Sequence, residues 1–331
     1  MSADSTHWTS RRVLVTGASG FVGSWVVKAL LDRQAEVTAL VRDLDGRSEL
    51  VRSGAIQEVA VVNGCLEDYA AVERAINEHE VDTVFHLAAQ GIVGAAQRNP
   101  LPTFESNIRG TYHVLEACRV HAGLVKSVVI ASSDKAYGDS ETLPYTEQHP
   151  LVGRHPYDVS KSCADLLASA YHHTYRLPVA IARCGNIYGG GDLNWSRLVP
   201  GTIRSLLRGE RPVLRSDGTP VRDYFFVQDA AAAYLTLAEQ IGRTDVVGGA
   251  FNFSAESSVS ARELVEAIQS VLGAANLPPV ILGQTGGEIK RQTLSTERAR
   301  TVLGWSAKFG LSEGLAKTVA WYRDFLGGTR T

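Results

Sequence analysis

Three side chains between residues 133 and 161 are of the types needed to take a proton from a substrate hydroxyl. Tyr157 and Lys161 are four residues apart, so on a helix they stand on one face and converge on one substrate. A cationic lysine beside a tyrosine favours the phenolate, and we expect it to lower the pKa of Tyr157 toward neutrality. The tyrosine then becomes a general base at physiological pH. Ser133 supplies a hydroxyl that can bond the same substrate oxygen.

Asp134 and Lys135 follow the serine directly and add a second acid–base pair. Oxidation of an alcohol alone does not need this pair, so it predicts chemistry beyond hydride transfer. The alternative is a solvent-exposed turn before Ala136, because turns favour such residues after a strand. For Tyr157 and Lys161, the alternative is an ordinary helix face.

The composition of the 331-residue chain is that of an ordinary soluble protein, with 44% hydrophobic residues, 21% charged residues and a net charge of −2. Nothing in it predicts attraction to nucleic acid or to an anionic membrane. Residues 1–10 are polar and lack the apolar core of a signal peptide, and no apolar run is long enough for a membrane span. The four cysteines are widely spaced and form no C-x-x-C pair, which favours reduced thiols, no structural metal and a cytoplasmic location.

Short β-branched runs alternate with longer amphipathic stretches in the first half of the chain, which predicts a parallel sheet with right-handed crossovers. The expected strands are residues 13–15, 36–41, 58–62, 83–87, 127–131 and 179–183. The expected helices are residues 21–32, 68–78, 103–121 and 156–175.

The pattern changes after Cys184, where glycine-rich and Asp-Gly loop signals surround further helical segments. Helices are expected near residues 198–208, 227–239, 261–272, 295–303 and 312–325. We expect a dinucleotide-binding domain over residues 1–184, with a return of the chain near 222–256. A smaller substrate lobe then comprises residues 185–221 and 257–331.

A glycine-rich turn follows the first strand and opens the first helix. Its spacing is G-x-x-G-x-x-G, and glycine lets the backbone approach a pyrophosphate at a helix N-terminus. A tight strand–helix turn without a ligand is the alternative. The position upstream of a Tyr-Lys pair favours a nicotinamide dinucleotide site. The residues expected to line it are Gly17, Ser19, Gly20, Phe21, Val22 and Gly23.

The chain resembles the extended short-chain dehydrogenase/reductase superfamily, in its nucleotide-sugar epimerase/dehydratase branch. The resemblance extends from Arg12 to about Trp321 and is carried by several motifs in the right order. Besides the glycine turn and the Ser133, Tyr157 and Lys161 set, these are Phe85-His86-Leu87-Ala88-Ala89, Asn107, Arg183-Cys184-Gly185-Asn186-Ile187-Tyr188-Gly189, Arg222-Asp223-Tyr224 and Leu303-Gly304-Trp305. The resemblance implies an α/β Rossmann fold, a doubly wound parallel sheet, with a smaller C-terminal α/β lobe for a sugar nucleotide.

The resemblance also implies which residues meet the cofactor, NAD or NADP. Relatives that use NAD commonly carry an acidic residue where this chain has Val41, followed by Arg42 and Asp43. An arginine there can pair with the 2′-phosphate of NADP, which tilts the expectation toward NADP. Asp43 can instead serve the ribose or cap a turn, and Arg42 can be a surface charge. Further expected cofactor contacts are Leu66, Leu87, Ala88, Ala89, Asn107, Tyr157 and Lys161, while His86 is expected to pack under the cofactor without a catalytic role.

The branches of this superfamily differ in the step after the sugar is oxidised at C4. The 4,6-dehydratases carry an acid–base pair after the serine or threonine, and local sequence is most similar to the CDP-glucose 4,6-dehydratases. The resemblance assigns Asp134 as the acid for the C6 oxygen and Lys135 as the base at C5. The expected activity is therefore that of a lyase making a 4-keto-6-deoxy sugar nucleotide. The alternatives are a nucleotide-sugar 4-epimerase with an incidental pair, and a non-catalytic dinucleotide sensor on the same fold.

A nucleoside-diphosphate hexose is the partner that the resemblance implies, and its diphosphate needs cations and amide donors. The candidate substrate-binding residues are Gln90, Asn186, Arg197, Arg222 and Arg291; Arg197 is a weaker candidate, as is Arg215. The resemblance also implies a homodimer. Its interface would be built from residues 103–121 and 156–175 of each subunit.

Overall fold

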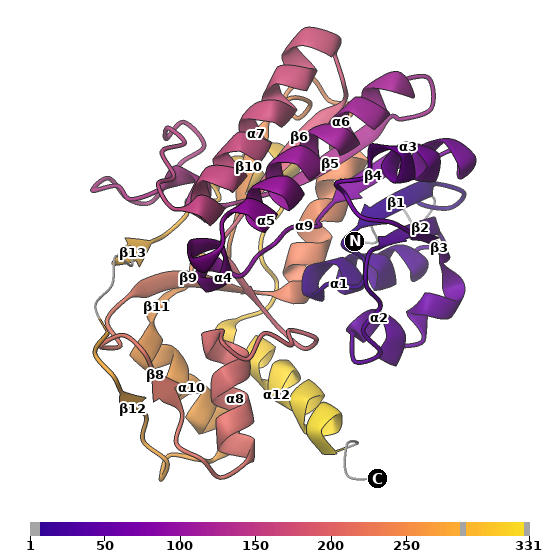
Figure 1. Cartoon of the computed structure of the whole chain (residues 1–331). Helices are drawn as coiled ribbons and strands as arrows, with labels where there is room; N and C mark the ends of the chain where they lie inside the picture. The colour runs from indigo at the N-terminus through magenta and orange to yellow at the C-terminus, as the bar shows by residue number, and fades with distance from the viewer. Residues whose placement is uncertain (1–6, 285–288, 328–331) are drawn as a thin grey trace.

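The computed structural model describes residues 7–284 and 289–327 and is built around a seven-stranded sheet (Figure 1). All neighbouring strands are parallel, in the order β10-β6-β5-β4-β1-β2-β3. The strands are β1 (Arg12–Thr16), β2 (Glu36–Val41), β3 (Ala60–Asn63), β4 (Thr83–His86), β5 (Ser127–Ser133), β6 (Val179–Cys184) and β10 (Ala250–Phe253). The first six follow the strand order of a doubly wound dinucleotide-binding sheet, so the predicted fold class is confirmed.

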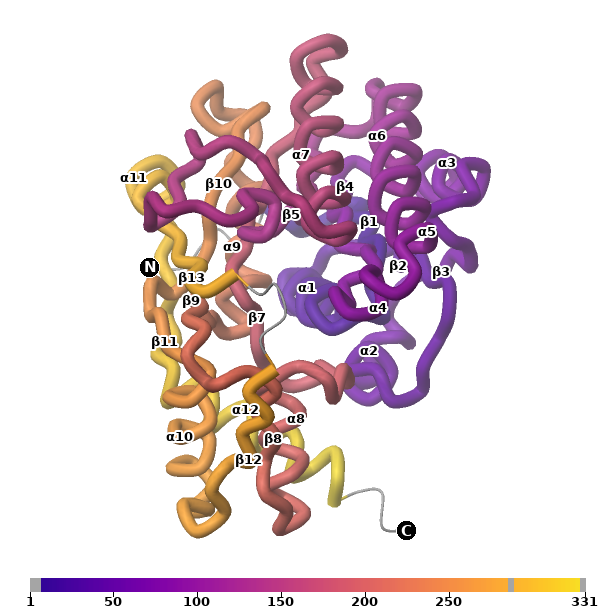
Figure 2. Tube along the Cα trace, turned by 60° about the vertical axis from the view of Figure 1, so that its left-hand side comes forward, coloured from indigo at the N-terminus to yellow at the C-terminus, as the bar shows by residue number. Residues whose placement is uncertain are grey.

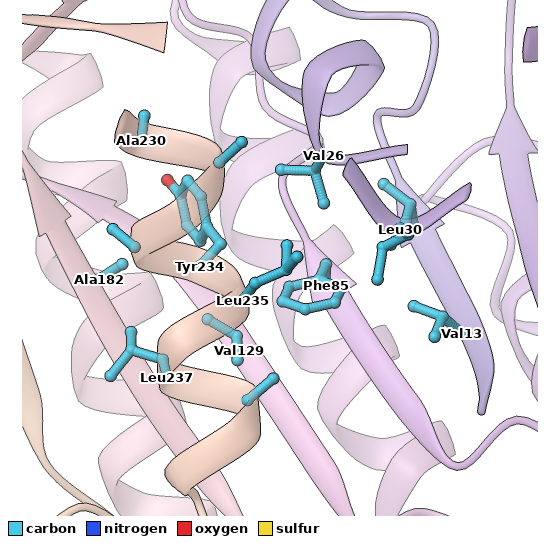
Figure 3. Packing of buried hydrophobic residues seen from close by; sticks show 14 of the residues in the cluster. Val13, Val26, Leu30, Phe85, Val129, Ala182, Ala230, Tyr234, Leu235 and Leu237 are labelled. Carbon is cyan, nitrogen blue, oxygen red and sulfur yellow. The ribbon is translucent and has the colours of Figure 1, made fainter. Parts of the chain in front are cut away.

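Helices cover both faces of this sheet because alternate residues of each buried strand point to opposite sides. Val13 and Val15 belong to the hydrophobic cluster on one face, and Leu14 belongs to the cluster on the other. The first face packs against α1 (Phe21–Leu31) and α9 (Val227–Gln240), as Figure 3 shows for Val26, Leu30, Tyr234 and Leu235. The second face packs against α3 (Tyr69–Glu78), α6 (Gly110–Val120) and α7 (Pro156–Tyr175).

One expected helix, residues 103–121, is divided in the structure. It consists of α5 (Leu101–Phe104), a π-helical turn η2 (Glu105–Arg109) and α6. A π-turn accommodates an extra residue and turns the side chains that follow it onto a different face. Three short helical segments before it were not expected: α2 (Glu49–Arg52), η1 (Ala55–Glu58) and α4 (Val93–Arg98).

A second group of elements packs below the carboxyl ends of the strands (Figure 2). A small sheet has the order β11-β9-β13, with β7 also paired to β9, and a two-stranded ribbon joins β8 and β12. These strands are β7 (Asn186–Tyr188), β8 (Val213–Leu214), β9 (Val221–Phe226), β11 (Ser258–Ser260), β12 (Val280–Ile281) and β13 (Arg291–Gln292). The helices are α8 (Leu198–Leu207), α10 (Ala261–Leu272) and α12 (Leu311–Gly327), while α11 (Glu297–Leu303) packs beside β10.

The loop of residues 189–192 joins the two groups of elements. Trp25 of α1 donates its indole N–H to Gly190 O at 2.8 Å, and Tyr322 of α12 donates its hydroxyl to Asp192 O at 2.6 Å. A side chain at position 190 would collide with the ring of Trp321, so glycine is required there. This packing sets the position of the chain that leads to Arg197. No helix in the described ranges is long and apolar enough to cross a membrane.

Candidate active site

The carboxyl ends of β1, β4 and β5 open into a cavity of about 1140 Å³. This is where ligands bind in open α/β sheets. Its lining includes the glycine turn on one side and residues of β7, α8 and β9 on the other. In the part of the chain that the structure describes, no group of three or more His, Cys, Asp or Glu side chains is arranged to hold a metal ion.

The glycine turn has the geometry that a dinucleotide pyrophosphate needs. Gly17 has φ +74°, and a Cβ there would lie 2.7 Å from the backbone nitrogen of Ala88. The turn is closed by a hydrogen bond from Gly20 N to Gly17 O at 2.9 Å. No side chain caps α1, so its first amide groups face the cavity beside Ser19, Phe21 and Val22. These residues fit a bound dinucleotide, because such amides bind anions.

Arg42 and Asp43 lie at the end of β2, outside the lining of this cavity. Both are exposed and pair with each other, with Arg42 Nε 2.7 Å from Asp43 Oδ2. Asp45 and Ser48 line the cavity on the same side, and the sequence patterns did not reveal them. The Ser48 hydroxyl is buried and has no hydrogen-bond partner in the structure.

The other predicted cofactor residues divide into two groups. Leu87, Ala88 and Ala89 follow β4 and line the cavity. Leu66 is buried, and a side chain on Gly110 would lie 2.6 Å from its Cβ, so it packs beneath α6. Asn107 is also buried and is not part of the lining; its side chain bonds Gln90 N at 2.7 Å and Ser160 Oγ at 2.9 Å.

Tyr157 and Lys161 stand one turn apart on α7 and both line the cavity. The Lys161 ammonium donates to Ala131 O at 2.7 Å, and burial lowers its pKa to about 8. Burial raises the pKa of Tyr157 to about 12, while Arg197 and a hydrogen bond between Tyr157 and Ser133 lower it and Asp134 raises it further. The expectation of a pKa near neutrality is therefore wrong for the protein without its ligands. Desolvation of the phenolate outweighs the nearby positive charge.

Replacing Lys161 by methionine is expected to stabilise the ligand-free fold at neutral pH. The pKa of Lys161 falls from 10.5 to about 8, which corresponds to roughly 3 kcal/mol of charging cost. Loss of the hydrogen bond to Ala131 O costs about 1 kcal/mol of stability. We therefore expect a net gain of about 2 kcal/mol in the free energy of unfolding. The folded pKa is lowered, so this gain is full below pH 8 and disappears as pH rises toward 10.5. Urea unfolding at several pH values measures it, and a less stable variant at pH 7 would contradict it.

Asp134 and Lys135 lie in a short 3₁₀ segment, η3 (Asp134–Tyr137), directly after Ser133. Asp134 is only 2% exposed, and both residues line the cavity, so they do not form a solvent-exposed turn. Asp134 Oδ1 accepts hydrogen bonds from the Ser133 hydroxyl at 2.9 Å and from Lys135 Nζ at 3.3 Å. The three residues therefore form one hydrogen-bonded acid–base group.

Two amide oxygens complete the surroundings of Lys135. Its Nζ lies 3.4 Å from Asn186 Oδ1 and 3.4 Å from Gln292 Oε1. Gln292 is a buried residue of β13 that no sequence pattern identified. Strand β13 pairs with β9, and the carboxylate of Asp223 in β9 accepts a hydrogen bond from Leu294 N, just after β13, at 2.7 Å. The oxygen atoms of Asp134, Asn186 and Gln292 are acceptors for the N–H groups of Lys135.

The predicted substrate-binding residues do not all reach the cavity. Gln90, Asn186, Arg197 and Arg222 line it, and so do Arg204 and Arg215. Arg197 is held by Asp192, with Arg197 Nη1 3.0 Å from Asp192 Oδ2. Arg291 is exposed on β13 and is not part of the lining. A strand alternates its side chains, so Gln292 rather than Arg291 faces inward.

Comparisons with known proteins agree with this geometry. The NAD dependent epimerase/dehydratase family model matches residues 13–252. The CDP-glucose 4,6-dehydratase of Salmonella typhimurium is 30% identical over 342 aligned residues, covering 98% of this chain and 94% of that protein. The UDP-glucose 4-epimerase of Mycolicibacterium smegmatis is 32% identical, covering 95% of this chain and 99% of that protein.

A solved structure is similar along nearly the whole chain. The dTDP-glucose 4,6-dehydratase of Streptomyces venezuelae, crystallised with NAD, has a TM-score of 0.87 and 30% identity, covering 96% of this chain and 98% of that one. Dehydratases and epimerases are thus both among the relatives, which leaves the reaction to be argued from the site. The glycine turn, the Tyr-Lys pair and the extent of these matches together lead to one conclusion: this chain is an enzyme of the NAD dependent epimerase/dehydratase family.

Proposed function

We propose that this enzyme is a nucleotide-sugar 4,6-dehydratase, which converts a nucleoside-diphosphate hexose into its 4-keto-6-deoxy product. The observation that carries the proposal is the group formed by Ser133, Asp134 and Lys135 in the cavity that also holds Tyr157. An epimerase only oxidises C4 and returns the hydride to C4, and these steps do not need the second acid–base pair, Asp134 and Lys135. Elimination of water needs both an acid and a base.

The proposed roles are based on the placement of each side chain. A bound nicotinamide dinucleotide supplies the hydride acceptor at C4 and the hydride donor at C6. Tyr157 takes the proton of the C4 hydroxyl, and Ser133 bonds the same oxygen. Lys135, as the neutral amine, then takes the C5 proton, and Asp134, which has received the proton that Lys135 gave up, protonates the C6 oxygen as it leaves as water. When hydride returns to C6, Lys135 gives its proton back to C5.

Lys135 must be neutral when it acts as the base. Its nitrogen contacts Asp134 Oδ1 at 3.3 Å and the amide oxygens of Asn186 and Gln292 at 3.4 Å, and the proton that it gives up before elimination passes to Asp134, which becomes the acid. We propose that substrate binding rearranges these contacts.

We propose NAD as a cofactor, because a similar dehydratase was crystallised with NAD. The preference for NADP stays a prediction based on Arg42. In the structure Asp43 pairs with that guanidinium, and a carboxylate there repels a 2′-phosphate and accepts hydrogen bonds from ribose hydroxyls. Assays of this enzyme therefore need both dinucleotides.

We propose that the diphosphate of the substrate lies near Asn186, Arg197 and Arg222. All three line the cavity on the side opposite the glycine turn. A homodimer through α6 and α7 is also part of the proposal. Large apolar side chains are exposed on these two helices, namely Tyr112, Val120, Leu166 and Tyr175.

Mass spectrometry of reactions with CDP-, UDP-, GDP- and dTDP-hexoses tests the proposed reaction. We expect one nucleotide series to lose about 18 mass units, since dehydration removes one water. An unchanged mass with a shifted chromatographic position would show epimerisation and refute the proposal. Reactions without enzyme are the control for spontaneous loss of water.

A further inference from the structure

A chain of hydrogen bonds runs beneath the glycine turn, through a histidine that the proposed chemistry does not use. Thr16 Oγ1 lies 2.8 Å from His86 Nδ1 and accepts from Ala88 N at 3.3 Å. His86 Nε2 lies 3.0 Å from Thr111 Oγ1, which donates to Asn107 O at 2.6 Å. His86 is 3% exposed, so water does not compete for these bonds.

The direction of each hydrogen bond in this chain follows from the acceptor at its end, the carbonyl oxygen of Asn107. A carbonyl oxygen only accepts, so the Thr111 hydroxyl gives its proton to Asn107 O and must accept from His86. His86 therefore carries its proton on Nε2, and its bare Nδ1 accepts from the Thr16 hydroxyl. Burial, with a contribution from the charge of Lys161, lowers the pKa of His86 to about 3, which keeps this neutral form at physiological pH.

The chain continues from Asn107 to the catalytic helix. The Asn107 amide donates to Ser160 Oγ at 2.9 Å and accepts from Gln90 N at 2.7 Å. Ser160 in turn donates to Tyr157 O at 2.7 Å. Asn107 lies in the π-helical turn η2 (Glu105–Arg109), and such turns often occur at functional sites. The glycine-turn strand and Tyr157 are thus joined by one continuous set of directed bonds.

We propose that His86 is a positioning residue that sets the distance between the dinucleotide site and Tyr157 through Thr111, Asn107 and Ser160. Hydride transfer from C4 needs the nicotinamide, the sugar and the tyrosine hydroxyl within a narrow geometry, and small displacements cost large factors in rate. These hydrogen bonds, which form a relay from Thr16 through His86, Thr111 and Asn107 to Ser160, hold β1, β4, η2 and α7 in register at the place where these groups meet. It serves C4 oxidation, so it deepens the proposed function but is the same for a dehydratase and an epimerase.

The shape of His86 alone does not perform this task. An apolar side chain of similar size would fill the space but leave the Thr16 donor without its acceptor and the Thr111 oxygen without its donor. Glutamine carries an acceptor and a donor on one terminal group, as the neutral imidazole does. The two replacements therefore separate packing from hydrogen bonding.

The test compares His86→Met with His86→Gln in the full chain. For His86→Met we expect reduction of bound dinucleotide by substrate, at saturating concentrations of both, to slow about 100-fold. We also expect NAD to bind about tenfold more weakly by calorimetry, because Thr16, which holds Ala88 N, loses its hydrogen bond to His86. For His86→Gln both quantities should stay within about threefold of the wild type. Equal losses in the two variants, or a wild-type rate in His86→Met, would overturn the proposal.

A second pair covers the case in which His86→Met does not fold. Thr111→Val keeps the shape of the side chain and removes the hydroxyl, whereas Thr111→Ser keeps the hydroxyl. Thr111 is buried and does not line the cavity, so a rate loss in the valine variant alone supports the relay. Equal rates in the two variants would overturn it.

Nitrogen NMR of the histidines gives a readout that needs neither substrate nor cofactor. We expect His86 to be neutral, with its proton on Nε2, from pH 5 to pH 8, since its pKa is about 3. A proton on Nδ1 would refute the bond directions on which the proposal rests. If no nucleotide sugar reduces the bound cofactor in the wild type, the proposed function fails. The NAD affinity of the variants and the tautomer of His86 then still test whether His86 is a positioning residue.

Discussion

Replacing Lys135 by methionine is expected to stop the loss of water while the first oxidation step continues. Methionine keeps the length and apolar stem of the side chain but has no nitrogen to take the C5 proton. General-base catalysis contributes up to about 10⁴-fold, and we expect dehydration to fall at least about 10³-fold. Because Tyr157 and Lys161 are unchanged, reduced dinucleotide should accumulate on the enzyme. Absorbance at the wavelength of the reduced nicotinamide, followed together with product mass, measures both steps.

The matched control is Lys317→Met, which removes an exposed lysine on α12, outside the cavity lining. It should dehydrate substrate at the wild-type rate. If Lys135→Met also dehydrated at that rate, another group would be the base and the proposed role of Lys135 would fail. If both steps stopped together, Lys135 would be needed for binding or folding, which cofactor titration and unfolding measurements distinguish.

Replacing Tyr157 by phenylalanine is expected to stop the reaction one step earlier. Phenylalanine retains the ring that packs against the cavity wall, but it cannot take the C4 hydroxyl proton. We expect reduction of the bound dinucleotide to slow about 10³-fold or more, with NAD affinity nearly unchanged. No reduced cofactor should accumulate, in contrast to Lys135→Met.

The pH dependence of the wild type provides a second check on Tyr157. Burial raises the pKa of Tyr157 to about 12, so the phenol is the main form at neutral pH. In the proposed mechanism the base is the phenolate, and therefore the rate of C4 oxidation should rise with pH across the neutral range. The positive charge of a bound oxidised nicotinamide favours the phenolate and should move this rise to lower pH. A rate independent of pH from 6 to 10 would contradict the role of the phenolate in the slow step.

Tyr175→Phe is the control for this substitution, since Tyr175 lies on the same helix and is 55% exposed. We expect its turnover to equal that of the wild type. If Tyr157→Phe reduced cofactor at the wild-type rate, the proton would have to go to Ser133 or to water. The proposed site would then need a different base.

Much of the dinucleotide half was predictable because its signals are local. Val13, Leu14 and Val15 form a short apolar run that only a strand covered on both faces can bury. Gly17 is required by the close approach of the backbone at Ala88, and the glycine spacing made this visible. The spacing of Tyr157 and Lys161 sufficed to place both on one helix face, since a helix repeats every 3.6 residues. The sequence signals for these features each lie within a few residues.

Other features of the site arise only when distant segments fold together. Gln292 is 157 residues from Lys135, yet its amide oxygen lies 3.4 Å from the Lys135 nitrogen. No local pattern marks it, because β13 is a two-residue strand whose place depends on pairing with β9. The same pairing leaves Arg291, a predicted substrate-binding residue, exposed outside the cavity lining.

The electrostatics of the catalytic residues were also decided by the tertiary structure. The sequence by itself determined that Tyr157 and Lys161 stand on one helix face, but it suggested a lowered tyrosine pKa. Burial of both groups raises the pKa of Tyr157 and lowers that of Lys161, because desolvation disfavours each charged form. Side-chain types and spacing are encoded locally, whereas burial is a property of the whole fold. The chain's sequence therefore determined which groups are proposed to do the chemistry, and only the packed structure decided their burial and their partners.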